Sequence, residues 1–296
     1  MKSILIKSSF IAFLFVFAGL LHLNDTNVSA ETIASDDFQG QAFYVSKSKM
    51  ELGRWGARLS EAQKKQIEAR LKNRLEKEYI LTFNKEEALF YEDEKLDAMT
   101  GATDSWGKNF APGKQYKNVK TNTQIQSQEF YGKKFLVKDQ LQSIQWVLGK
   151  ETKQIGNYMC FKATASIPTN DLAWYDFSWS RLGNNNNQAE KEKDSTATTS
   201  EEPEVEVAMT EVEAWYSPQI PVGHGPLEYW GLPGLILEVS AGNTTMLCTK
   251  IVMNPKEKLE IEAPDKGKEV TKSEYQKTIV EKMTEFRNNR VGRRRS

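Results

Sequence analysis

The sequence predicts a mainly β, α+β fold, built as a single curved antiparallel sheet or half-barrel with two flanking helices. Three observations predict it. Short runs of alternating polarity recur along the chain, the links between most of them are short and polar or contain glycine, and two helix-like segments lie outside the central runs. Such links are too short for parallel crossovers, which need about a dozen residues or more, so neighbouring strands should be antiparallel.

The clearest strand lies around residues 158–165, where Met159, Phe161, Ala163 and Ala165 share one face. Leu247, Ile251 and Met253 share a face in the same way. The other predicted strands are Phe43–Lys47, Tyr79–Phe83, Ala88–Glu92, Phe135–Lys138, Ser143–Leu148, Leu172–Ser180, Val205–Trp215 and Leu235–Val239.

Each predicted helix starts with a capping box, in which the first and fourth residues exchange hydrogen bonds. Ser60 and Gln63 open the first, which has a narrow apolar stripe and should end near Lys77. Thr271 and Glu274 open the second. The apolar faces are Ile67, Leu71 and Leu75 in the first helix and Tyr275, Ile279, Met283 and Phe286 in the second.

The chain divides into four predicted parts: a signal peptide at 1–30, a β-rich domain at 31–270, a C-terminal amphipathic helix at 271–290 and a basic tail at 291–296. Lys2 and Lys7 precede an apolar run at 10–21, and small residues follow at 28–30, which is typical of a secretion signal. A membrane anchor, the alternative, needs about 20 apolar residues. We therefore expect no transmembrane segment after cleavage and an exported product, located in the periplasm, at the outer membrane or outside the cell.

Residues 183–204 are rich in Asn, Ser, Thr, Glu and Lys and lack aromatic and large aliphatic side chains, which predicts a disordered insertion within the β-rich domain. Removing residues 1–30 leaves 40 − 2 = 38 basic and 40 − 1 = 39 acidic side chains. A nucleic-acid partner needs a basic surplus, and only the C-terminal arginines offer one, so we expect no nucleic-acid binding and interpret them as a solvated tail.

Cys160 and Cys248 are the two cysteines, and each lies in a strand-like run. Two interpretations stay open. A disulfide between them would suit an exported protein and would stabilise by about 4–5 kcal/mol at most in the chain-entropy model. Alternatively, both are buried thiols that pack as small apolar groups.

The segment that follows Glu213 has a distinctive composition. Trp215 and Tyr216 precede a Pro- and Gly-rich stretch with His224, then come Tyr229, Trp230 and the hexapeptide Gly-Leu-Pro-Gly-Leu-Ile at 231–236. These motifs resemble the GLPGLI family of exported Bacteroidetes proteins, and the likeness covers roughly residues 130–255. The resemblance implies an exported β-rich protein, with no known reaction or catalytic residue.

Prolines fix φ and glycines allow positive φ, so the Pro/Gly stretch should be irregular yet stiff. One interpretation makes Trp215, Tyr216, His224, Tyr229 and Trp230 a ligand- or partner-binding site at the rim of an apolar cleft. The other makes the aromatic residues a plug at one end of the sheet, with His224 a hydrogen-bonding loop residue rather than a general base.

No catalytic residue, metal site or cofactor is predicted. His224 is the one histidine after residue 30, which excludes a multi-histidine metal centre within one chain. Carboxylate pairs such as Glu86 with Glu87, or Asp93 with Glu94, are weak candidates for acid and base of glycoside hydrolysis.

Three hypotheses for function follow. The first is a non-catalytic envelope protein that binds an apolar small molecule, a lipid or an envelope protein partner. The second is an unrecognised envelope enzyme that uses His224, an acidic residue or the cysteines. The third is an assembly or scaffold component of an outer-membrane system.

Overall fold

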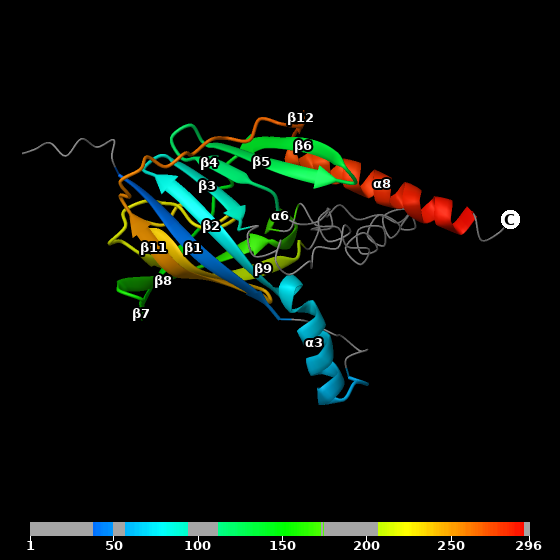
Figure 1. Ribbon diagram of the computed structural model, residues 1–296, viewed down its shortest axis with the longest axis horizontal. Helices are drawn as coiled ribbons and strands as arrows, with labels where there is room; N and C mark the ends of the chain where they lie inside the picture. The colour runs from blue at the N-terminus through cyan, green and yellow to red at the C-terminus, as the bar shows by residue number, and fades with distance from the viewer. Residues whose placement is uncertain (1–37, 50–56, 94–111, 173, 175–206, 293–296) are drawn as a thin grey trace, which may run out of the picture. The chain divides into compact units, whose positions relative to one another are not determined.

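The computed structural model describes residues 38–49, 57–93, 112–172, 174 and 207–292. Within these residues the chain forms one sheet of twelve strands and three helices, so the predicted mainly β fold is confirmed (Figure 1). The strand order is β12-β6-β5-β4-β3-β2-β1-β11-β10-β9-β8-β7. The predicted signal peptide (1–30) and insertion (183–204) lie outside the described residues, as do residues 293–296 of the tail.

The strands and helices have the following bounds: β1 Gln39–Ser48, α3 Glu61–Leu75, β2 Glu76–Asn84, β3 Glu87–Glu92, β4 Gln115–Asn118, β5 Thr123–Phe130, β6 Lys133–Gln140, β7 Val147–Ile155, β8 Tyr158–Pro168, α6 Thr169–Leu172, β9 Met209–Ser217, β10 Leu235–Ala241, β11 Thr244–Met253, β12 Lys268–Val270 and α8 Lys272–Gly292.

The sheet is open and mixed, rather than purely antiparallel or closed. Every neighbouring pair is antiparallel except β12 with β6, which are parallel. The prediction from short links was wrong for this pair because β12 follows β6 only after more than a hundred residues, which allows any direction.

Several strand predictions were wrong in detail. Residues 143–146 precede β7 rather than belonging to it, and Leu172 ends the short helix α6 instead of starting a strand. β4, β5 and β12 were not predicted. Residues 175–180 of the strand predicted at 172–180 lie outside the described part of the chain.

Both capping boxes are present. The backbone N–H of Ser60 donates to Gln63 Oε1 (2.9 Å), and the backbone N–H of Gln63 donates back to Ser60 Oγ (3.2 Å). At α8 the backbone N–H of Thr271 donates to Glu274 Oε2 (2.8 Å), and that of Glu274 donates to Thr271 Oγ1 (3.2 Å). No helix in the described ranges is both long enough and apolar enough to cross a membrane.

One face of the sheet carries the core and is called the inner face below. Ala42, Leu81, Ala88, Ala163 and Ala214 lie on it, and all are fully buried. The end of this face at β6 packs against α8, whose Tyr275, Ile279 and Met283 cluster with Phe135 and Val137 (Figure 1). The inner face therefore positions the residues described next.

Candidate functional site

The Pro/Gly loop, residues 218–234, connects β9 to β10 and is largely buried. Its inward side chains join the core of the inner face, and their exposure does not exceed 6%. They are Ile220, Val222, His224, Glu228, Tyr229 and Leu232. The loop therefore covers part of the inner face with its own side chains.

The hexapeptide at 231–236 folds back onto the start of the same loop. The backbone N–H of Leu235 donates to the carbonyl of Ile220 (2.9 Å), and that of Ile236 donates to the carbonyl of His224 (3.0 Å). A bulge follows Ile236, whose carbonyl accepts from the buried hydroxyl of Tyr44 on β1 (2.6 Å). The two ends of the loop are thereby fixed to each other and to the sheet.

Lys117 on β4 anchors the middle of the loop. Its side chain is fully buried, and Nζ donates to the carbonyls of Gly225 (2.7 Å), Leu227 (2.7 Å) and Tyr229 (3.3 Å). Burial lowers the pKa of Lys117 to about 7, and the nearby Glu228 carboxylate opposes this shift. Three loop carbonyls thus accept from the side chain of one lysine.

Glu228 is the loop's buried carboxylate, and it accepts hydrogen bonds from four segments of the chain. Oε1 accepts from Gln115 Nε2 (2.9 Å) and Trp174 Nε1 (2.9 Å). Oε2 accepts from Gln124 Nε2 (2.8 Å) and from Lys272 Nζ (3.3 Å) at the start of α8. Because a buried charge is costly unless paired and hydrogen-bonded, this carboxylate ties β4, β5, residue 174 and α8 to the loop.

His224 is fully buried beneath the sheet. Nε2 lies 3.1 Å from the carbonyl oxygen of Asn84, so it carries the proton, and the buried Nδ1 has no partner in the described part of the chain. Burial lowers the pKa of His224 to about 3, with a further lowering by the charge of Lys117. At neutral pH the imidazole is therefore uncharged, and it does not face solvent.

This shift predicts a specific loss of stability in acid. Between pH 6.5 and 3 the unfolded chain binds a proton at His224 that the folded chain does not, so stability falls as the pH is lowered. From pH 7 to pH 4 the loss should be about 3 kcal/mol. Urea unfolding of the wild type and of His224→Gln, which keeps a donor for Asn84, measures it. Equal acid losses in both proteins would contradict this role of His224.

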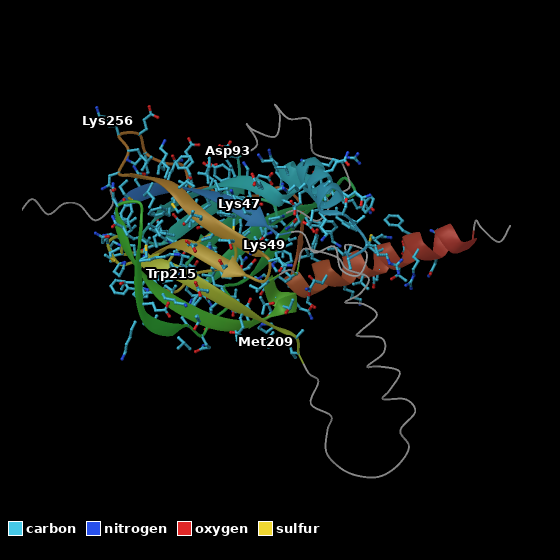
Figure 2. All side chains as sticks on the ribbon, turned by 90° about the horizontal axis from the view of Figure 1, so that it is seen from below. Lys47, Lys49, Asp93, Met209, Trp215 and Lys256 are labelled. Carbon is cyan, nitrogen blue, oxygen red and sulfur yellow. The ribbon has the colours of Figure 1, made fainter. Side chains whose placement is uncertain are left out.

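Trp215 and Tyr216 lie on opposite faces of β9, because successive side chains of a strand alternate. Trp215 packs beneath Lys153, whose Nζ lies 4.3 Å from the ring centroid, and its Nε1 donates to Glu213 Oε1 (2.9 Å). Tyr216 is buried against Phe161 on the other face. Figure 2 labels Trp215 near one end of β9 and Met209 at the other.

The two remaining predicted site residues, Tyr229 and Trp230, have structural contacts in the loop. Tyr229 is buried in the core. Trp230 is half-buried, and its Nε1 donates to the carbonyl of Gln142 (2.7 Å), while Trp146 Nε1 donates to the carbonyl of Trp230 (2.8 Å). The five predicted site residues are therefore not gathered around one accessible point.

Both cysteines are buried, and the structure holds them as free thiols. Each Sγ donates to a carbonyl of its own strand: Cys160 to Tyr158 (3.6 Å) and Cys248 to Lys250 (3.5 Å). Burial raises the pKa of Cys160 to about 11 and that of Cys248 to about 12. Neither thiol is activated as a nucleophile.

Glu86 and Glu87, the first of the two acidic pairs, make ordinary polar contacts. Glu86 pairs with Lys120 (2.7 Å), and Glu87 accepts from Asn84 Nδ2 (3.2 Å) and from the hydroxyl of Tyr116. Glu94 lies outside the described residues. Over the ranges that the structure describes, no three His, Cys, Asp or Glu side chains are grouped as metal ligands would be.

Sequence reasoning missed the polar residues under the loop, which are Lys117, Glu228 and the glutamines of β4 and β5. A signal for the glutamines was present, since Gln124, Gln126 and Gln128 recur at every second position. In the structure these three are buried, while Ile125 between them is only half-buried. The polarity of β5 is thus inverted, with amides on the inner face.

Comparisons with known proteins give a partial family match and distant structures. No curated protein matches the chain. Two structures of PNGF-II, in the C2 and P21 space groups, are similar at 14% identity, with TM-scores of 0.45 and 0.40. The matches cover 82% and 77% of this chain but only 32% and 29% of those chains, so this chain spans about a third of their length. Over residues 146–238, from just before β7 into β10, the chain is similar to an uncharacterised family described as "Protein of unknown function (Porph_ging)".

Proposed function

We propose that the protein is a non-catalytic binding protein of the bacterial cell envelope, which recognises an extended segment of an envelope partner along the open edge of β7. The secretion signal predicted at 1–30 and the GLPGLI-like motifs support export to the periplasm or outer membrane of a Bacteroidetes cell. The buried, neutral His224 and the two protonated thiols favour binding over catalysis.

The single observation that carries the proposal is the exposure of β7. It is the last strand at its end of the sheet, and seven of its nine residues are exposed. Val147 and Leu148 are 68% and 56% exposed, the largest such values among the exposed apolar side chains of the described residues. An edge strand offers unpaired backbone groups to which an extended segment can add.

The hairpin geometry shows which backbone groups point outward. Residues 156–157 form a two-residue turn, so Ile155 and Tyr158 exchange hydrogen bonds and the pattern alternates from there. Lys153 bonds to β8, whereas Thr152 and Gln154 direct their N–H and C=O groups to the open edge. On β8, the backbone groups of Met159 accordingly point away from β7. Its N–H donates to Gln219 Oε1, and its carbonyl accepts from Ser217 Oγ.

The chemistry of the edge specifies the partner segment. The β7–β8 register shifts between Leu148 and Thr152, and this irregularity limits which strands can add. Glu151 and Lys153 are engaged by Lys162 and Glu238, whereas Lys150 has no ion pair among the residues described. We expect a segment that is apolar beside Val147 and Leu148 and acidic beside Lys150. An apolar small molecule is a weaker candidate, because the loop covers part of the inner face.

Photo-crosslinking tests the proposal in cells. A benzoylphenylalanine in place of Leu148 should give one defined adduct, mapped by mass spectrometry to an extended partner segment. The adduct should persist in Thr152→Ala, which keeps the outward N–H, and disappear in Thr152→Pro, which removes it but leaves the bonds to β8. An equal adduct from Leu247, exposed on β11, or one unaffected by Thr152→Pro, would overturn the proposal.

A further inference from the structure

Four buried glutamines on β4 and β5, called the glutamine row below, and Tyr275 on α8 contain buried polar atoms that the described residues do not satisfy. Five such atoms have no hydrogen-bond partner in the described part of the chain. They are the amide nitrogens of Gln126 and Gln128, the amide oxygens of Gln115 and Gln124, and the hydroxyl of Tyr275. All five residues are at most 3% exposed.

These five groups belong to one site. Gln115 bonds to both Gln126 (3.1 Å) and Glu228, and Gln124 bonds to the other oxygen of Glu228. Gln128 is the cross-strand partner of Phe135, whose ring packs against Tyr275 with centroids 5.3 Å apart. The Tyr275 ring in turn packs against Trp174, which donates to Glu228.

Leaving a buried polar group unsatisfied costs about 1–3 kcal/mol, so five together would be a large penalty for a folded protein. Native proteins usually satisfy such groups with an ordered water or a ligand. The inverted pattern of β5 shows that these amides occupy positions where apolar side chains would otherwise lie.

We infer that the glutamine row binds a neutral guest through hydroxyl groups, either those of ordered water or those of a small sugar or polyol. The unsatisfied atoms include two donors, two acceptors and one hydroxyl that can do both, and a hydroxyl guest both donates and accepts. A cationic guest would lack a free anion, because both oxygens of Glu228 already accept from donors. An anionic guest would face Glu228 and two amide oxygens. This site is independent of the β7 edge.

Substitution distinguishes a filled site from unpaired groups. In Gln128→Met the side chain keeps nearly the same length but loses its amide, and no other side chain of the site loses a hydrogen-bond partner. If the amide binds a guest, this variant should lower Tm by about 3 °C or more relative to the exposed control Gln140→Met. If it is simply unpaired, apolar replacement should leave Tm unchanged or raise it, which would overturn the inference.

Two further measurements identify the guest and remain informative if a variant fails to fold. A high-resolution crystal structure of the wild type should show density within hydrogen-bonding distance of Gln126 Nε2 or Gln128 Nε2. Absence of such density would overturn the inference. Glucose, N-acetylglucosamine and glycerol should each be added during thermal unfolding. If one of these compounds raises the Tm of the wild type but not that of Gln128→Met, the guest is a sugar or polyol. If none raises the Tm and the crystal structure shows density at the site, the guest is water.

Discussion

Replacing Glu228 with glutamine is expected to lower the free energy of unfolding by about 3–5 kcal/mol, the largest effect of any conservative substitution in the loop. The carboxylate accepts from four donors, two on each oxygen. The amide of a glutamine has one NH2 group in place of an oxygen. That group would face two hydrogen-bond donors and could not accept from them. The same change removes the negative charge that pairs with Lys272 and lies near the buried Lys117.

Glu238→Gln is the matched control for this experiment. Glu238 also pairs with a lysine, Lys153 at 2.7 Å, but on the partly exposed outer face of β10. Such a pair contributes about 1 kcal/mol or less. Urea unfolding of both variants gives the comparison, and a cost for Glu228→Gln no greater than that for Glu238→Gln would contradict the role given to Glu228.

Replacing Gly234 with alanine is the second large expected effect, at about 3 kcal/mol. A Cβ on Gly234 would lie 2.3 Å from the carbonyl oxygen of Ser217 and 2.5 Å from its carbonyl carbon. Both are backbone atoms at the end of β9, so a side-chain rotation cannot relieve the contact. The second glycine of the hexapeptide is therefore required where the loop returns to the sheet.

Gly156→Ala controls for the general cost of replacing a turn glycine. Gly156 has φ +57, and a Cβ there would meet no atom within 4 Å. The expected cost is about 1 kcal/mol, from the left-handed backbone alone. Thermal or urea unfolding should separate the two variants clearly, and a Gly234→Ala protein as stable as Gly156→Ala would show that the backbone approach is not tight.

The fold class could be predicted because most strands have apolar side chains at every second position. The pattern of β8, with Ala163 and Ala165 buried on the inner face, follows this rule. β5 could not be predicted in the same way, because its buried positions are occupied by Gln124, Gln126 and Gln128. A search for apolar side chains at every second position does not find a strand whose inner face is polar.

The sequence also showed which segment is distinctive, but not whether that segment is exposed. Prolines and glycines indicate a stiff, irregular loop, and this is compatible with either a binding rim or a buried cover. The outcome depends on Lys117, which binds the carbonyl of Gly225 108 positions away, and on Glu228, which binds Gln115 113 positions away. Local pattern carries no information about such a contact.

Hydrogen–deuterium exchange of the wild-type protein tests most directly whether the Pro/Gly loop is a buried structural element. The amide of Gly231 in the loop and those of Leu235 and Ile236 at the start of β10 donate to loop carbonyls, at 2.8, 2.9 and 3.0 Å. We predict that they exchange as slowly as the amide of Val239 in the core of β10, because they open only with the sheet. Rapid exchange of these three amides beside a protected Val239 would contradict the buried arrangement and restore the loop as an accessible binding rim.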